Sequence, residues 1–181
     1  MLPTTHAIIS WSISQPLQNR KDRIIITATS IIPDLDGLGV LFSIDFYSKY
    51  HHTIGHNLLF ITLTSLVLSL FSKERKRVFL LSLISLHAHL LGDLLGSGTG
   101  WGIKYFLPFN EYYLEFAPPF HWELDSWQNL VITALLIIYV LRQGVKKERT
   151  IMEIFSLRLD QKIVQAIKKR LKCSAYPTMK G

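Results

Sequence analysis

The stretch Leu83–Leu95, LISLHAHLLGDLL, carries ionisable side chains within an apolar helical pattern. His89 and Asp93 are four residues apart, which places both side chains on one face of a helix. A neutral imidazole and a carboxylate on one face can bind one metal ion. Because an unpaired carboxylate in such apolar surroundings is costly or takes up a proton, Asp93 needs partners from elsewhere in the chain.

Two other histidines are expected to have different roles. His87 points roughly opposite to His89 on a helix, so we expect it to pack against a neighbouring element or an interface. His121 stands beside Trp122 in an aromatic and acidic stretch, and it is expected at the membrane interface.

The acidic pair Asp34 and Asp36 follows the apolar segment 22–32, in the sequence PDLDG. Proline disfavours the helical conformation of the residue before it, and glycine loosens the chain that follows, so the pair is predicted on a turn or a broken helix. About twelve helical residues span roughly 18 Å. The pair is therefore expected part-way through the bilayer or at its far face.

Histidines also cluster in HHTIGHN, residues 51–57, where another apolar segment begins. His52 and His56 are four residues apart and His51 and His56 are five apart, so either pair can converge at a helix start. The remaining candidate is His6, in the apolar segment 1–15.

The composition indicates a membrane protein whose metal ligands are nitrogen and oxygen atoms. Of the 181 residues, 49% are hydrophobic and only 18% are charged, whereas a soluble domain usually carries about a quarter charged residues. The single cysteine, Cys173, excludes an intramolecular disulfide and a cysteine-based zinc site. Any metal must therefore use histidines and carboxylates.

A net charge of +7 would ordinarily suggest nucleic acid as a partner, but the placement of the charges argues against it. Basic clusters at 20–23, 73–77 and 142–149 alternate with apolar stretches, and a basic tail follows. That rhythm is typical of a multi-pass inner-membrane protein that follows the positive-inside rule. The N-terminus has no basic region before its apolar residues, so no secretory signal is predicted.

These patterns predict an all-α polytopic helical membrane bundle with about four membrane segments, at 22–32, 54–71, 78–95 and 127–141. Residues 101–125 are expected to form a capping loop. The predicted domains are 1–145, a membrane domain with the metal site, and 146–181, a basic cytoplasmic tail. In the tail, apolar residues at steps of four predict a C-terminal amphipathic helix, which lies either on an anionic membrane surface or against its own protein.

If the three basic clusters mark one side of the membrane, an antiparallel bundle gathers the histidines and aspartates at the other side. The set comprises His6, Asp34, Asp36, His51 or His52, His56, His89 and Asp93. Mixed nitrogen and oxygen ligands suit a divalent metal, with zinc favoured and manganese or iron as alternatives. Either two metals share bridging aspartates, or one metal is bound and a spare carboxylate acts as base. Both arrangements indicate hydrolysis.

Four short motifs occur in this order: THAI at 5–8, PDLD at 33–36, HHTIGHNLL at 51–59 and HLLGD at 89–93. With them, residues 5–108, and also 122–127, resemble the bacterial membrane-bound, metal-dependent hydrolases, also described as LexA-binding, inner-membrane-associated hydrolases. The usual third motif of that family, His-Arg-x-x-Thr-His-Ser, falls on residues 51–57. The resemblance implies ligand roles for His51 and His56, with His52 in place of the arginine and Gly55 in place of the threonine.

The resemblance also carries the ligand role to His6, Asp34, Asp36, His89 and Asp93. It implies a metal site more directly than a substrate.

We therefore predict a metal-dependent hydrolase of the inner membrane that cleaves an ester or phosphodiester of a lipid or lipid-linked substrate. The expected first ligands are His51, His56, His89 and Asp93, with His6 completing the set. Asp34 and Asp36 are the expected catalytic residues, which either bridge metals or serve as general base. The expected partners are membrane lipid and a lipid or phosphoester substrate; the sequence does not identify a protein partner.

Two alternatives from other classes remain at this point. Intramembrane histidines and aspartates also mark the ion paths of transporters and proton relays. A non-catalytic membrane anchor would instead use the basic tail to hold a partner or DNA.

Overall fold

The structure is a computed structural model that describes residues 1–175, apart from the side chains of Ser48 and of 172–175. The last six residues of the predicted tail, 176–181, lie outside the described residues. The regular elements of the described chain are all helices, as predicted. The chain divides into two units, Met1–Thr133 and Ala134–Gly181. All predicted site residues belong to the first unit.

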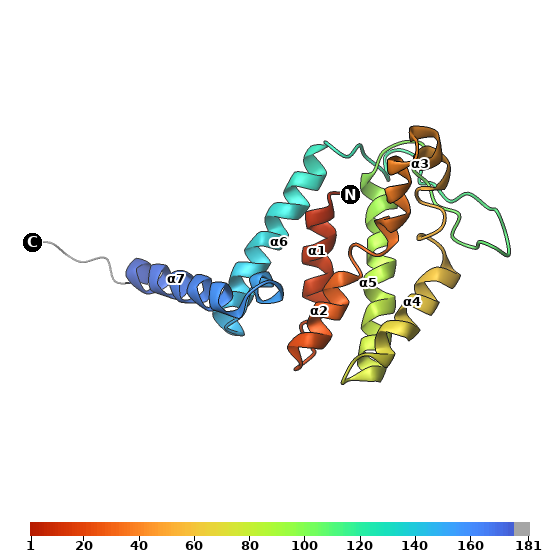
Figure 1. The fold of residues 1–181 in the computed structure, drawn as a ribbon. Coiled ribbons are helices and arrows are strands. Elements are labelled where there is room, and N and C mark those ends of the chain that lie inside the picture. Colours follow the sequence, from red (N-terminus) through yellow and green to blue (C-terminus); the bar gives the residue numbers. More distant parts are fainter. Residues whose placement is uncertain (176–181) are drawn as a thin grey trace, which may run out of the picture. The chain divides into compact units, whose positions relative to one another are not determined.

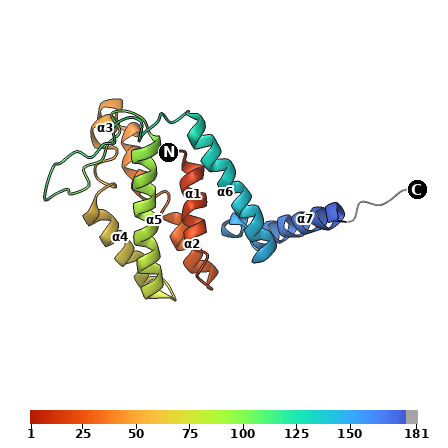
Figure 2. The same ribbon diagram turned by 180° about the vertical axis from the view of Figure 1, so that it is seen from behind.

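Helix α5 (Arg75–Gly96) is the central element of the first unit. It contacts α4 (Leu58–Leu70), α1 (Pro3–Ile13) and α2 (Arg20–Ala28). Figure 2 shows α5 between α4 on one side and α1 on the other. The buried apolar cluster on α5 consists of Leu86, Leu90 and Leu94, packed with Ile61 of α4 and Ile103 of the following loop. This packing holds α5 rigidly where its last turns carry His89 and Asp93.

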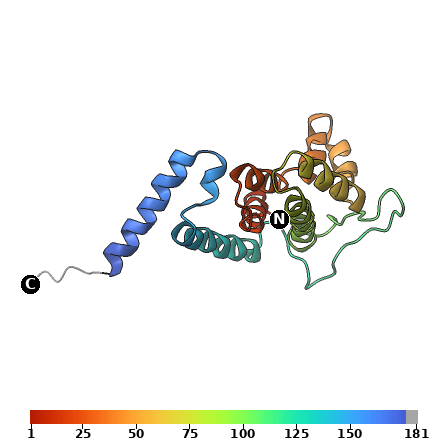
Figure 3. The same cartoon turned by 90° about the horizontal axis from the view of Figure 1, so that it is seen from below.

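Two helical hairpins, α1–α2 and α4–α5, have their turns at the same end of the unit, the lower end in Figure 1. The buried carboxylate of Asp22 joins the turns, because it accepts hydrogen bonds from the backbone nitrogens of Lys73 (3.0 Å) and Glu74 (2.8 Å). Glu74 in turn accepts a bond from the backbone nitrogen of Gln18 (2.9 Å). In the view from below, α1 and α5 are seen nearly end-on (Figure 3).

The chain breaks after α2, as PDLDG predicts. A 3-10 helix, η1 (Pro33–Leu41), follows, and its axis is bent by 53° from that of α2. Pro33 stands at the start of η1, where its fixed φ is tolerated and its missing N–H has no partner to lose. Helix α3 (Ile44–Tyr50) comes next, capped by the side chain of Ser43.

Helices α5 and α6 (Trp127–Lys146) are long and apolar enough to cross a membrane, and the bent pair α2–η1 makes a third candidate. The prediction of about four segments is not confirmed. The sequence places the start of one segment at Ile54, but residues 51–57 form turns, and α4 begins only at Leu58. Its 13 residues reach only ~20 Å, less than the ~30 Å apolar core of a bilayer.

The second unit contains η2 (Ile151–Ile154) and α7 (Leu157–Ala175), the helix predicted in the tail. Asp160 of α7 accepts hydrogen bonds from the backbone nitrogen and the hydroxyl of Thr150, at 2.7 and 2.6 Å. Val164 is buried within this unit, whereas Leu159 and Leu171 are exposed. The apolar face of α7 is thus only partly covered within the second unit.

Candidate metal centre

The end of α5 that carries His89 and Asp93 is where the predicted histidines and aspartates meet. The two residues contact each other across one helical turn, with Nε2 of His89 3.0 Å from Oδ2 of Asp93. Helix α1 contributes His6, the 3-10 helix η1 contributes Asp34 and Asp36, and the turn before α4 contributes the clustered histidines. Hence four segments of the first unit build one site.

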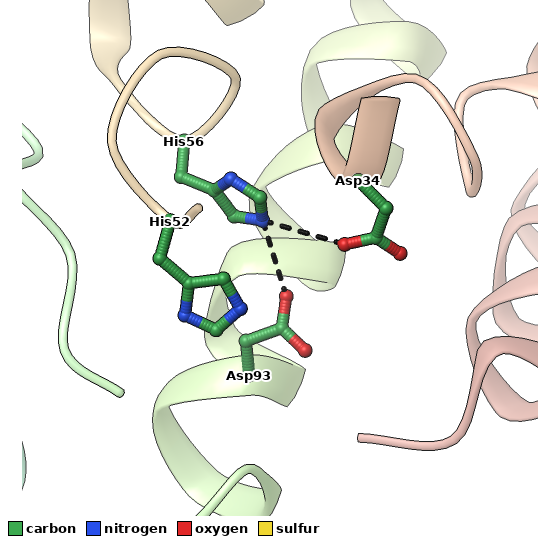
Figure 4. Close-up of side chains that lie close together, drawn as sticks. All are labelled: Asp34, His52, His56 and Asp93. Atoms are coloured by element: carbon green, nitrogen blue, oxygen red, sulfur yellow. Dashed lines mark ion pairs between the residues drawn. The ribbon is translucent and has the colours of Figure 1, made fainter. Parts of the chain in front are cut away.

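Four ligand-type atoms form the inner part of the site: Nε2 of His56, Nε2 of His89, Oδ1 of Asp34 and Oδ2 of Asp93. The His56 nitrogen lies 3.6 Å from each of the two oxygens, and these two contacts are drawn in Figure 4. The His89 nitrogen lies 3.3 Å from the Asp34 oxygen and 3.0 Å from the Asp93 oxygen. In a tetrahedral site with bonds of about 2.0 Å, ligand atoms lie about 3.3 Å apart. The four nitrogen–oxygen distances are close to this spacing, although His56 and His89 belong to different groups of mutually close ligand atoms.

Three of these four atoms are buried without a hydrogen-bond partner: Nε2 of His56, Nε2 of His89 and Oδ2 of Asp93. They are close to one another, but their directions do not make hydrogen bonds. A buried polar atom left unpaired costs free energy, and several such atoms aimed at one point are satisfied together by a cation. The donor set therefore fits a divalent metal that accepts nitrogen and oxygen ligands, such as zinc.

His52 also belongs to the group of possible ligands, although the expected ligands include His51 in its place. Ligand atoms of Asp34, His52, His56 and Asp93 all lie within 4.8 Å of one another. Nδ1 of His52 donates a hydrogen bond to the Trp101 carbonyl (2.9 Å), so Nε2 carries the free lone pair. Figure 4 shows the His52 ring beside His56 and Asp93. The φ angle of His52 is +63°, a left-handed conformation that helix spacing does not predict.

Asp36 holds its neighbours in place. Its Oδ1 accepts a hydrogen bond from Nδ1 of His51 (2.8 Å), and its Oδ2 accepts from the Gly55 backbone (3.0 Å) and from Nδ1 of His56 (3.2 Å). A carboxylate that binds the far nitrogen of a ligand histidine fixes its tautomer and orientation. The structure thus places Asp36 and His51 behind His56, next to the inner atoms rather than among them.

A second group of possible ligands consists of His6, His89 and Asp93. Nε2 of His6 lies 3.0 Å from Oδ1 of Asp93, and the His6 ring stacks on the His89 ring with centroids 4.0 Å apart. Asp93 Oδ1 also contacts the Met1 nitrogen (2.8 Å) and the Ser97 hydroxyl (3.3 Å). The two groups share Asp93, whose Oδ2 lies near both His56 and His89 and whose Oδ1 lies near His6.

Two of the three histidines in the turn 51–57 differ in their affinity for protons. Burial lowers the pKa of His52 to about 4. Burial also acts to lower the pKa of His56, but the neighbouring carboxylates of Asp34, Asp36 and Asp93 outweigh it and raise that pKa to about 10. Without a metal, the carboxylates around His56 therefore favour the protonated, positively charged form of its ring.

Residues 1–159 match the family described as YdjM inner membrane protein. The chain belongs to this family. The match covers every residue of the two ligand groups, and the family description together with the apolar helices makes this an inner-membrane protein. Comparisons with curated proteins and with solved structures give no match.

In this member of the YdjM family, a cavity of about 540 Å³ opens over the site and reaches Asp34 and Asp93. Tyr47, Trp101 and Glu123 line it as well. No role was predicted for these three residues, because they lie in separate segments with no spacing that marks them. Only the aromatic and acidic character of residues 101–125 hinted at a cover over the site.

The remaining histidines lie apart from the ligand groups. Nε2 of His87 is 2.8 Å from the hydroxyl of Tyr105, and its Nδ1 donates to the Leu83 carbonyl (2.8 Å). His121 contacts the Thr99 hydroxyl at 3.1 Å. His87 thus packs against the loop after α5, in line with the expectation of a packing histidine.

Proposed function

We propose that this protein is a membrane-embedded, metal-dependent hydrolase that cleaves an ester or phosphodiester of a lipid or lipid-linked substrate. The observation that carries the proposal is the convergence of buried, unpaired ligand atoms from His56, His89 and Asp93 below an open cavity. A catalytic metal needs a free position, and the cavity supplies access to it. The motif resemblance to hydrolases supports the same class, and no residue argument supports LexA binding.

Zinc is the proposed metal, with manganese or iron as alternatives. When bound, a divalent ion with an open position lowers the pKa of a bound water and polarises a phosphoryl or acyl oxygen. His52, His56, His89 and Asp93 would hold it, with Asp34 at the cavity side. Asp93 belongs to both groups of possible ligands, so it would be the shared ligand if two ions bind.

The two predicted catalytic aspartates have different surroundings. Both oxygens of Asp36 accept hydrogen bonds from the protein, so Asp36 orients His56. The side chain of Asp34 is 32% exposed and lines the cavity. In Figure 4 its second oxygen points away from His56. Asp34 is therefore the carboxylate we assign to accept a proton from the attacking water.

An amphiphilic substrate accounts for the apolar surface beside the cavity. Gly37 and Tyr47 line the cavity. The chain between them exposes large apolar side chains, with Phe42 82% and Leu41 78% exposed. Such a surface next to a polar site suits a molecule with an apolar tail and a polar head group.

We also propose a multi-pass topology with the site at the non-cytoplasmic side. The basic turn 73–77 lies at one end of α5 and Asp93 near the other, about 27 Å apart along the helix axis. By the positive-inside rule the basic turn faces the cytoplasm. The α2–η1 pair and the short α4 would then complete a bundle of about four segments with α5 and α6.

The test is metal analysis of the detergent-purified protein by mass spectrometry, together with hydrolysis assays. Wild type should retain metal, His89→Ala should lose it, and His87→Ala, on the same helix but bonded to Tyr105, should retain it. Metal-loaded wild type should hydrolyse phospholipid in mixed micelles. Cleavage of bis(p-nitrophenyl) phosphate without cleavage of phospholipid would contradict the lipid substrate.

The alternatives give different results in the same preparations. A protein free of metal that moves protons or ions across liposome membranes would be a transporter. A phenotype that disappears on deletion of α7 but persists in His56→Ala would indicate a membrane anchor.

A further inference from the structure

A second, smaller cavity lies next to the first. Its volume is about 110 Å³, and it is more enclosed than the cavity over the metal centre. His51, His52 and Trp101 line both cavities. The three side chains are therefore a common wall, with the metal ligands on one side and a separate compartment on the other.

The charges that line the two cavities are of opposite sign. Asp34, Asp93 and Glu123 line the large cavity, where a metal cation would balance them. Lys49 and Lys104 line the small one, and none of its lining residues is acidic. The lysines come from distant parts of the chain, α3 and the loop after α5. The fold thus creates a cationic compartment directly beside an anionic one.

The small cavity also offers neutral hydrogen-bond donors. The Tyr113 hydroxyl accepts a bond from the Gly102 backbone nitrogen (2.8 Å), so its own proton remains to be donated. Among the described residues, the carboxylate that pairs with Lys104 is that of Glu111, at 3.8 Å, and it is 82% exposed. Such a solvent-exposed pair is weak, so it leaves the Lys104 ammonium able to bind another anion.

We propose that this compartment, the Lys49–Lys104 pocket, binds a phosphate group of the substrate while the scissile bond lies at the metal centre. The volume accommodates an oxyanion of a few heavy atoms but not a sugar or an acyl chain. Two ammonium groups and a hydroxyl are the donors that a phosphate accepts. The inference extends the proposed hydrolase: its substrate carries an anionic group at a fixed distance from the bond that is cleaved.

The test uses the full-length protein in nanodiscs of phosphatidylcholine, freed of metal by chelation, and inorganic phosphate as the probe. Calorimetric titration should show saturable phosphate binding to wild type. In the variant Lys49→Ala/Lys104→Ala the affinity should fall at least about tenfold, because two charge-assisted contacts are lost. The matched control, Lys162→Ala/Lys169→Ala on α7, should bind phosphate as wild type does. Metal retention by the Lys49→Ala/Lys104→Ala variant shows that its site is folded.

Two further nanodisc preparations, one with phosphatidic acid and one with oleic acid at the same total charge, show whether the pocket binds a lipid phosphate or a soluble phosphate ester. Weaker binding of free phosphate only with phosphatidic acid assigns the pocket to a lipid phosphate. Equal binding in both discs assigns it to a soluble phosphate ester. Unchanged affinity in the Lys49→Ala/Lys104→Ala variant, or no saturable binding to wild type, would overturn the pocket assignment. The titration contains no metal, so it tests the phosphate pocket alone. The proposed hydrolase is tested separately, by metal content and by hydrolysis assays.

Discussion

Nδ1 of His56 donates a hydrogen bond to Oδ2 of Asp36 at 3.2 Å, and Nε2 of the same ring faces Asp34 and Asp93. The carboxylate therefore selects the tautomer of a proposed metal ligand from behind. This contact predicts how metal affinity changes when one carboxylate oxygen of Asp36 is replaced by an amide nitrogen.

Asp36→Asn is expected to lower metal affinity by about 10- to 100-fold, the usual effect of losing such a supporting group. The amide nitrogen would face one of three donors that now bond to Asp36, so His56 loses its fixed orientation. Competition with a chelator of known affinity measures the effect. Asp125→Asn, an exposed change, is the control. Equal affinity in the two variants would refute the orienting role.

Gly92→Ala is expected to act through His6. A Cβ at position 92 would lie 2.8 Å from Cε1 of His6, so the ring must move away from Asp93. We expect lower metal content than in wild type, by mass spectrometry. In a His6→Ala background the same change should have little further effect, because the clash is gone. Additive losses in the double variant would contradict this explanation.

Metal affinity is expected to rise with pH across the neutral range. The pKa of His56 in the metal-free site is about 10, so its ring carries an extra proton at pH 7 that a metal must displace from Nε2. One displaced proton gives about a tenfold gain in affinity per pH unit. His52, with a pKa of about 4, is already neutral there and adds no such dependence.

The proton that metal binding displaces can be counted directly. Calorimetry in two buffers of different ionisation enthalpy should show about one proton released per metal bound near neutral pH. His56→Ala should bind metal weakly and release fewer protons. An affinity for metal that does not change with pH would show that His56 is not a ligand.

Asp22→Ala is expected to destabilise the first unit without touching the metal centre. The Asp22 side chain is buried and accepts hydrogen bonds from the backbone nitrogens of Lys73 and Glu74. Loss of these bonds leaves donors unpaired at the start of α5, at a cost of about 1–3 kcal/mol. Thermal unfolding in detergent measures the loss, and Glu111→Gln, at an exposed position, is the control. Asp22→Ala protein that remains folded should keep its metal. Metal loss below the unfolding temperature would contradict the claim that Asp22 acts on the fold and not on the metal centre.

The sequence was sufficient for the residue types of the site and for their arrival at one end of a helical bundle. His89 and Asp93 converge because helical spacing is local, and the break at PDLDG follows from the backbone of Pro33. The number of membrane segments predicted from hydropathy, about four, is not confirmed by the structure. The turns of 51–57 shorten α4, and hydropathy alone does not register backbone turns.

Only the tertiary structure decided which histidine of the pair lies among the possible ligands and what each aspartate contacts. His52 takes this place because its φ is left-handed and its Nδ1 donates a hydrogen bond to the carbonyl of Trp101, 49 positions away in the sequence. Asp36 turns both oxygens to the turn 51–56, whereas Asp34 keeps an edge open to the cavity. Such differences depend on the directions of side chains between distant segments. Periodicity and spacing describe only what neighbouring residues share along one element.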